Sequence, residues 1–179
     1  MNTLPQGFGI KELVPPETFA LGEDKALALM DQRLLDVLGQ LKAAFGYTMI
    51  IDSWGFASRK YDEATGSPYK YSGYRPVGCN VGVIGGAHYK GMAADIKFYD
   101  ATGKRIPTQT MQKLIIQNMA KFPKLVAMEL NVSWNHIDVM TEKDSSSRGG
   151  VVPGKIFMFN VTDNSKSWTA TKPEDSARV

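Results

Sequence analysis

The sequence is short of the residues from which proteins build covalent cross-links and metal sites. Its 179 residues include one cysteine, Cys79, and two histidines, His88 and His136. A single cysteine excludes an internal disulfide and any zinc site built mainly from thiolates. No apolar stretch is long enough to span a bilayer, and the first residues lack the basic and apolar regions of a signal peptide. We therefore expect no membrane insertion and no signal peptide.

Length and charge set further bounds. A chain of 179 residues fits one domain, and we predict a single domain over 1–162 followed by a polar tail over 163–179. The net charge of +3 is mildly basic. This balance is typical of an ordinary soluble surface, and it also suits contact with a polyanion such as a bacterial cell wall or nucleic acid. Charge alone does not distinguish these partners.

The hydrophobic pattern predicts an α+β fold. Apolar residues recur every three or four positions over 24–45, which predicts a long helix that ends at Gly46. A second helix is predicted from Thr108 or Thr110 to about Lys121. Strands are predicted at 48–52, 93–99, 125–130, 134–140 and 155–160. This order of elements predicts an antiparallel sheet with helices packed on one face.

A long polar and aromatic loop is predicted between the first two strands. From Trp54 to Tyr74 the chain is rich in glycine, serine, lysine and tyrosine. Irregular segments of this length inside a compact domain are usually either functional or disordered. Both a substrate groove and a mobile surface loop agree with this composition.

Each histidine lies in a stretch that also carries a carboxylate. His88 precedes Asp95 by seven residues, and the glycine and alanine residues between them allow a tight turn close to an ion. His136 and Asp138 share one face of a predicted strand with Trp134. We predict that His88, Asp95 and His136 bind one zinc ion and leave a coordination position open to water, as catalytic zinc sites do.

Three motifs resemble one metallopeptidase family. Gly86 to Asp95 is similar to the Ser-x-His-x-x-Gly-x-Ala-x-Asp motif of zinc D-Ala-D-Ala carboxypeptidases and L-alanyl-D-glutamate endopeptidases. The amino-terminal domain of hedgehog proteins shares that fold. Residues 134–138 resemble the family's second zinc motif, and residues 72–76 resemble its Ser-Gly-Tyr-Arg segment. The matches follow the family's order over roughly residues 48–140, and the amino-terminal arm resembles phage-encoded members.

The resemblance implies an enzyme and assigns roles to its residues. It makes His88, Asp95 and His136 the zinc ligands. It makes Arg75 the residue that binds a substrate carboxylate or steadies the oxyanion, for which a planar guanidinium is suited. The implied activity is hydrolysis of peptidoglycan stem peptides or cross-links, of D-Ala-D-Ala carboxypeptidase or endopeptidase type. We expect a monomer that binds peptidoglycan and not nucleic acid. The residues expected to contact substrate are Ser72, Tyr74 and Trp134.

The chain departs from the family at two positions. Gly86 replaces the usual serine, and Ser133 stands where many members carry an acidic general base. A serine cannot take a proton from water at neutral pH. Glu129, seven residues before His136, is therefore the candidate base. Asp138 is either a second candidate or a carboxylate that orients an imidazole.

Two other functions agree with the sequence. Without a carboxylate near the metal, the chain would be a catalytically inactive zinc-containing binding module. Without zinc, it would be a structural protein of a phage particle. Because no signal peptide is seen, the enzyme interpretation favours a phage lysis enzyme released from the host cytoplasm, or a virion-associated protein, acting in the cell wall.

Overall fold

A six-stranded mixed sheet forms the centre of the protein. The computed structural model describes residues 1–56, 69–82, 85–145 and 154–179. Within these residues the strand order is β1-β2-β4-β3-β5-β6. The strands are β1 (Thr48–Ile50), β2 (Ala93–Tyr99), β3 (Ala127–Glu129), β4 (Asn135–Asp138), β5 (Ile156–Phe159) and β6 (Trp168–Ala170).

One parallel pair distinguishes this sheet from the predicted one. β3 and β5 run parallel, with Ala127 opposite Phe157 and Glu129 opposite Phe159. The other neighbouring strands pair antiparallel. The α+β class is confirmed, whereas the prediction of a purely antiparallel sheet is wrong. Alternation of apolar residues could not have revealed the parallel pair, because the pattern is the same for either strand direction. The hedgehog-like fold stays a prediction.

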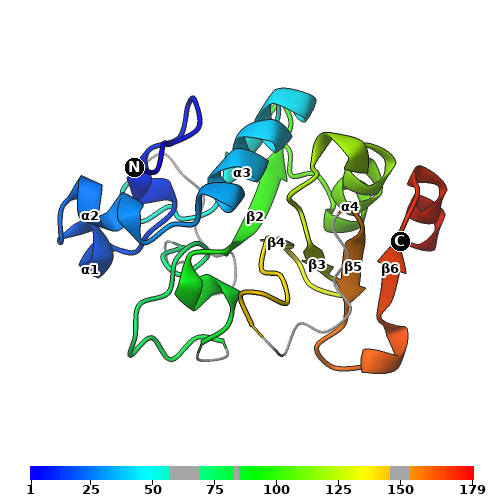
Figure 1. Ribbon diagram of the computed structural model, residues 1–179. Helices are drawn as coiled ribbons and strands as arrows, with labels where there is room; N and C mark the ends of the chain where they lie inside the picture. The colour runs from blue at the N-terminus through cyan, green and yellow to red at the C-terminus, as the bar shows by residue number, and fades with distance from the viewer. Residues whose placement is uncertain (57–68, 83–84, 146–153) are drawn as a thin grey trace.

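The two longest helices pack on one face of the sheet. Figure 1 shows α3 (Gln32–Phe45) and α4 (Thr108–Gln117) along the upper part of the molecule. Their inward side chains and alternate strand residues form one buried cluster, whose members include Leu38, Ile115, Ile96, Met128 and Ile137. Because side chains alternate across a strand, the neighbouring residues Asp95, Glu129 and His136 lie on the opposite face.

Shorter helical segments complete the described chain. The α-helical ones are α1 (Pro16–Phe19) and α2 (Glu23–Ala28). The 3₁₀ segments are η1 (Ile10–Glu12), η2 (Ala87–Lys90), η3 (Met119–Lys121), η5 (Asn164–Lys166) and η6 (Pro173–Arg178). No described helix combines the length and the hydropathy that a bilayer-spanning segment requires.

The helix predicted over 24–45 is divided in two. α2 ends at Ala28, and Asp31 caps the start of α3 by accepting a hydrogen bond from the amide of Arg33 at 2.8 Å. The amide of Asp31 donates to the carbonyl of Gly91 at 3.0 Å, so the break brings this part of the chain against the segment after His88. Aspartate is a preferred helix N-cap, a signal that the apolar periodicity concealed.

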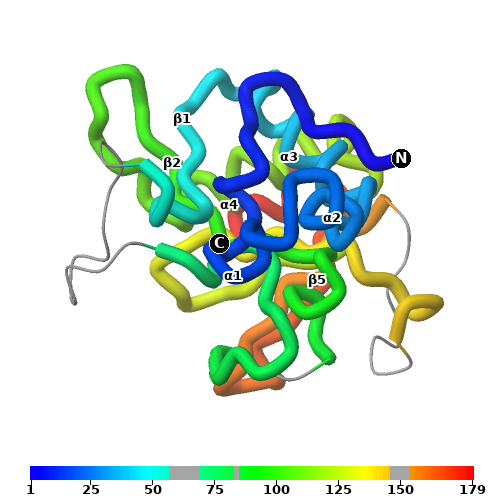
Figure 2. The backbone as a smooth tube through the Cα atoms, turned by 90° about the vertical axis from the view of Figure 1, so that its left-hand side faces the viewer, coloured from blue at the N-terminus to red at the C-terminus, as the bar shows by residue number. Residues whose placement is uncertain are grey.

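Both ends of the chain pack onto the domain. The amino-terminal arm folds beside α3 (Figure 2), where the amide of Thr3 donates to Gln32 Oε1 at 2.7 Å. Residues 163–179, predicted to be a polar tail, instead contain β6, which pairs with β5 and places Trp168 opposite Met158. A three-residue strand is too short to show the alternation that predicts strands from sequence.

We expect Leu38→Ala to lower the free energy of unfolding by about 2–5 kcal/mol, because the substitution leaves a cavity in a close-packed core. Leu38 is 0% exposed. Urea unfolding monitored by circular dichroism measures the change. The exposed substitution Lys113→Ala in the neighbouring helix should stay within about 0.5 kcal/mol of the parent. Equal stabilities of Leu38→Ala and the parent would contradict the described packing.

Candidate metal centre

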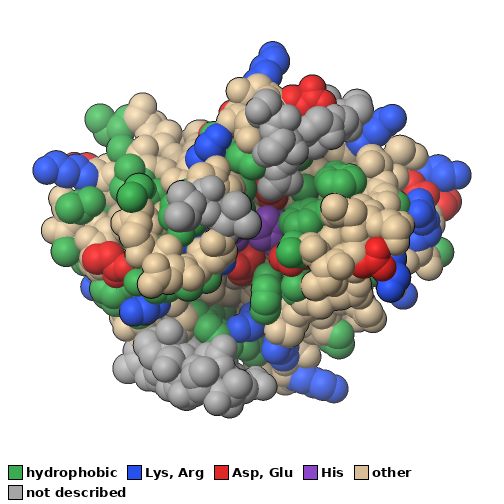
Figure 3. Space-filling model, turned by 90° about the horizontal axis from the view of Figure 1, so that it is seen from below, with side chains coloured by type: hydrophobic (Ala, Val, Ile, Leu, Met, Phe, Trp, Pro, Cys, Tyr) green, Lys and Arg blue, Asp and Glu red, His purple; other side chains and the backbone are tan. Residues whose placement is uncertain are grey.

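Three side chains from separate segments converge on the sheet face opposite the helices. His88 lies in η2, Asp95 in β2 and His136 in β4. Asp95 and His136 are direct partners in the antiparallel register of β2 and β4, so strand pairing alone places them side by side. Seen from below, histidine side chains lie at the base of a hollow in the surface (Figure 3).

The nearest atoms of these three side chains form a small triangle. His88 Nε2 lies 3.3 Å from His136 Nδ1 and 3.3 Å from Asp95 Oδ1. His136 Nδ1 lies 2.9 Å from the same oxygen. Ligand atoms ~2.0–2.2 Å from a tetrahedral ion are themselves ~3.3–3.6 Å apart. The triangle is thus close in size to one face of such a tetrahedron, and the cluster could hold a metal ion.

The other nitrogen of each imidazole faces an acceptor outside the triangle. His88 Nδ1 lies 2.8 Å from the carbonyl oxygen of Gly73, which can only accept, so Nδ1 carries the proton and Nε2 offers a lone pair. His136 Nε2 faces Asp138 Oδ2 at 3.5 Å, an ion-pair contact too long for a well-formed hydrogen bond. This partner favours a proton on Nε2 and a lone pair on Nδ1. Two lone pairs and a carboxylate oxygen therefore converge.

Burial and the mutual contacts of these side chains shift the pKa values of His136 and Asp95. Burial lowers the pKa of His136, but contacts with Asp138 and Asp95 raise it more strongly, to about 9. Burial raises the pKa of Asp95, but the rings of His88 and His136 hold it well below its usual range. A proton on His136 therefore balances the converging acceptors in the metal-free protein, and a bound cation would replace it.

Two glycines allow the backbone around the ligands to pack closely. Gly91 ends η2 with a φ of 66°, and a Cβ there would lie 2.1 Å from the carbonyl oxygen of Leu29. A Cβ on Gly73 would lie 2.0 Å from the carbonyl oxygen of Leu13. Any larger residue at either position would push the backbone that supports His88 away from the rest of the domain.

Arg75 braces the carboxylate of Asp95. Its Nη2 donates to Asp95 Oδ2 at 2.9 Å, which leaves Oδ1 for the triangle. Its Nε donates to the carbonyl oxygen of Tyr71 at 2.8 Å. Nη1 lies against Gly82, where an added Cβ would be 2.4 Å away. Arg75 is therefore partly engaged inside the protein before any substrate arrives.

A cavity of about 390 Å³ adjoins the triangle. Its wall includes the three candidate ligands together with Arg75, Glu129, Trp134 and Phe159. Glu129 is half-buried at the end of β3, and this burial raises the pKa of its carboxyl group, although His136 acts in the opposite direction. The cavity thus brings a candidate proton acceptor and a guanidinium to the same space as the triangle.

Comparisons of the chain with protein-family models, with curated proteins and with solved structures gave no match. The chemistry of the site therefore follows from its own residues and their geometry. The family resemblance of the three sequence motifs stays a prediction.

The remaining predicted site residues have other surroundings. Asp138 is fully buried behind His136 and accepts a hydrogen bond from the amide of Met140 at 2.7 Å, which suits orientation of the ring. Ser72 offers its backbone carbonyl to the amide of Asp95 at 2.7 Å, and Tyr74 packs against the main core. Neither Ser72 nor Tyr74 is among the described residues of the cavity wall, and their contact with substrate stays a prediction.

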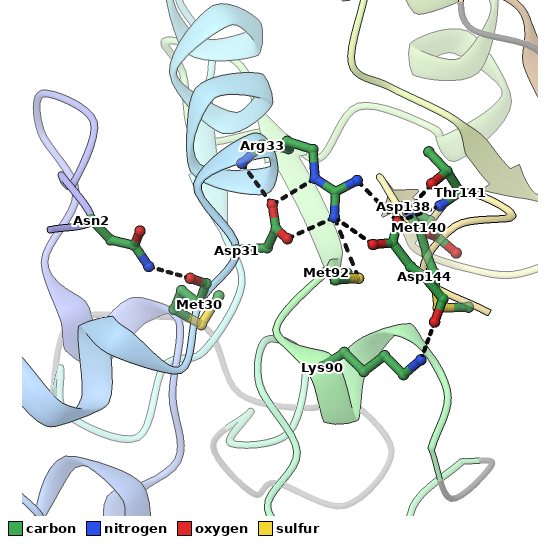
Figure 4. A network of polar contacts seen from close by, with 10 residues as sticks. All are labelled: Asn2, Met30, Asp31, Arg33, Lys90, Met92, Asp138, Met140, Thr141 and Asp144. Atoms are coloured by element: carbon green, nitrogen blue, oxygen red, sulfur yellow. Dashed lines mark hydrogen bonds and ion pairs between the residues drawn. The ribbon is translucent and has the colours of Figure 1, made fainter.

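A polar network supports the site from the helix side (Figure 4). The Arg33 guanidinium contacts Asp31 Oδ2 at 2.8 Å and Asp144 Oδ2 at 2.9 Å, and it approaches the sulfur of Met92 at 3.8 Å. Asp144 also accepts a hydrogen bond from the amide of Thr141 at 2.8 Å. The start of α3 is thereby tied to the segments that flank β2 and β4, which carry two of the candidate ligands.

Asp52 is a buried acid that the sequence analysis missed. Its Oδ1 accepts a hydrogen bond from the amide of Ser72 at 2.9 Å, and its side chain is 0% exposed. Burial raises the pKa of Asp52 to about 8, although the amides of Ser72 and Gly73 oppose the shift. The available signal was an acid directly after the apolar residues 49–51, a position that more commonly ends a strand at the surface.

We expect zinc chloride to raise the melting temperature of the metal-free protein, because an ion that binds only the folded state stabilises it. The gain is about 2.7 kcal/mol at a free concentration of 100 times Kd. Thermal unfolding with and without zinc measures it. His136→Ala and Asp95→Ala should each abolish the shift, whereas the exposed substitution Lys113→Ala should preserve it. An undiminished shift in His136→Ala would place the ion elsewhere.

Asp52 should make stability depend on pH. The unfolded protein loses this proton near pH 3.8, whereas the folded protein keeps it until about pH 8, so the contribution of Asp52 to the free energy of unfolding falls as pH rises across that interval. Asp52→Asn removes the titrating group and should flatten the profile. Urea unfolding across the interval compares the two proteins, with the exposed substitution Asp24→Asn as the control that keeps the parent slope. Parallel profiles for the parent and Asp52→Asn would contradict this expectation.

Proposed function

We propose that the protein is a zinc-dependent peptidase that hydrolyses peptidoglycan stem peptides or cross-links. The observation that carries the proposal is the triangle of three acceptor atoms beside a cavity that Glu129 and Arg75 also line. Two imidazoles and one carboxylate match the three protein ligands of catalytic zinc sites, whereas structural sites use four. Among the described residues, no fourth histidine, cysteine or acid belongs to the cluster.

The proton transfers fall to Glu129 in this proposal. A zinc ion held by the triangle would polarise a carbonyl and lower the pKa of a water ligand to about 7. Glu129 takes the proton of the attacking water and gives it to the leaving amine. Burial, which raises the pKa of its carboxyl group, brings that pKa closer to neutral pH and so favours both transfers.

In this proposal, the other residues of the cavity wall bind the substrate. Arg75 offers the part of its guanidinium that does not hold Asp95 to a terminal carboxylate or to the developing oxyanion. The apolar surfaces of Trp134 and Phe159 suit a small aliphatic side chain such as that of alanine. Both the D-Ala-D-Ala carboxypeptidase type and the endopeptidase type agree with this arrangement.

The setting of the proposed activity is the bacterial cell wall. The three motifs that resemble the zinc D-Ala-D-Ala peptidase family support peptidoglycan as the partner, with the protein acting as a phage lysis enzyme or as a virion-associated protein. One observation favours a second candidate, a zinc-containing binding module without turnover. Ser133, at the position where that family commonly carries its base, is exposed and does not line the cavity among the described residues.

Glu129→Gln tests the proposal directly. We expect the release of soluble fragments from purified peptidoglycan to fall by about 10²–10⁴-fold, because the amide cannot accept the proton. Zinc content, measured by mass spectrometry of the metal, should stay equal to that of the parent. The exposed substitution Glu174→Gln should leave both values unchanged.

The alternatives give different results in the same assays. Full activity of Glu129→Gln would remove Glu129 from its role. A parent that holds zinc but releases nothing from peptidoglycan would favour the binding module. A parent that takes up no zinc would favour a metal-free structural protein of a phage particle.

A further inference from the structure

The backbone turn over residues 71–75 supports the candidate ligands directly. The carbonyl of Ser72 accepts a hydrogen bond from the amide of Asp95 at 2.7 Å. The next carbonyl, that of Gly73, faces the Nδ1 of His88 at 2.8 Å. Two consecutive carbonyls therefore fix two ligands, and a change in the orientation of this turn would be transmitted to both.

Asp52 holds the first peptide plane of this turn. Its Oδ1 accepts the hydrogen bond of the Ser72 amide at 2.9 Å. That amide shares a rigid plane with the carbonyl of Tyr71, which accepts the Nε of Arg75 at 2.8 Å. The same guanidinium donates to Asp95 Oδ2 at 2.9 Å. A chain of hydrogen bonds thus connects the peptide plane that Asp52 contacts, through Arg75, to the carboxylate of Asp95.

Asp52 also acts on the second peptide plane. The amide of Gly73 interacts with the Asp52 carboxylate and favours its ionised form. This amide shares its plane with the carbonyl of Ser72, which holds the amide of Asp95. Asp52 is itself fixed at its own amide, which donates to the carbonyl of Glu12 at 2.9 Å. Both planes therefore lead to Asp95, one at its side chain and one at its backbone.

An acid at this position is buried at a cost. Asp52 is 0% exposed, and its Oδ2 has no hydrogen-bond partner among the described residues. Burial of a carboxyl group with an unsatisfied oxygen is unfavourable, although its loss would leave the amide of Ser72 without its acceptor. The Asp52 carboxyl group interacts with two backbone amides, and both amides belong to the turn that contacts the ligands.

We propose that Asp52 is a positioning residue of the metal centre, which sets the orientation of Asp95 through the peptide planes of Ser72 and Gly73. This inference rests on the proposed metal-dependent function. Outer contacts of this kind orient the ligands of a metal site, and their loss weakens metal binding by about 10–100-fold. Asp52 belongs to neither the cavity wall nor the triangle among the described residues, and the turn carries its hydrogen-bonded connection to the ligands.

Two substitutions of similar shape separate the hydrogen bonds from the packing. Asp52→Leu fills the same space without an acceptor, whereas Asp52→Asn keeps an oxygen that can face the two amides. Zinc affinity is measured on the full chain by competition with a chromophoric chelator. The visible absorption of the cobalt-substituted protein reports the ligand geometry independently of activity. Leu38→Ala serves as the control, because it is a packing defect on the other face of the sheet.

We expect Asp52→Leu to bind zinc about 10–100-fold more weakly than the parent and to shift the cobalt absorption bands. Asp52→Asn should bind zinc more tightly than Asp52→Leu, and its cobalt spectrum should stay close to that of the parent. Leu38→Ala should lower the melting temperature without changing either metal readout. If Asp52→Leu does not fold, the smaller acceptor-free Asp52→Ala replaces it with the same expectation.

Parent-like zinc affinity in a folded Asp52→Leu or Asp52→Ala would overturn the proposal. An equal loss of affinity in Asp52→Asn and Asp52→Leu would also overturn it, because the acceptor oxygen would then have no effect. A parent that binds zinc but leaves peptidoglycan intact would refute the peptidase alone, and the metal readouts would still decide the role of Asp52. A parent that binds no zinc would overturn both proposals.

Discussion

Two imidazole nitrogens and one carboxylate oxygen lie 2.9–3.3 Å apart at the wall of a cavity, and such an arrangement of acceptors is unfavourable unless a proton or a cation lies among them. The surrounding contacts keep the acceptors in place. The carbonyl of Gly73 and the carboxylate of Asp138 each face the outer nitrogen of one imidazole. Arg75 holds the second oxygen of Asp95. Each candidate ligand thus has a polar contact on the side away from the triangle, and such outer contacts orient the ligands of a metal site.

The sheet separates packing from chemistry. One face carries the apolar residues that meet α3 and α4, and the other carries Asp95, His136 and Glu129. Because neighbouring residues of a strand point to opposite faces, the same short strands serve both purposes. The antiparallel register of β2 with β4 brings two ligands together without any loop, whereas His88 depends on η2 and on the close approach of Gly91 to Leu29.

The α+β class and the approximate places of the strands could be predicted, because apolar alternation and helical periodicity are local properties of the chain. The cluster of His88, Asp95 and His136 could also be predicted from the sequence, because metal chemistry restricts the residue types that take part. The parallel pairing of β5 could not, because it depends on contacts with distant backbone. The division of the first helix was missed because the apolar periodicity concealed the helix cap at Asp31. Asp52 was missed because its partners are backbone amides, which no side-chain pattern reveals.

The parallel pairing of β3 with β5 has a consequence for the order in which the chain is synthesised. A nascent chain that has emerged as far as β4 already contains His88, Asp95, Glu129 and His136, but one edge of β3 has no partner. That edge stays open until β5, which begins at Ile156, leaves the ribosome. Unpaired strand edges associate with other extended chains. The interval between the two strands is therefore a period in which this edge is open to pairing with another chain.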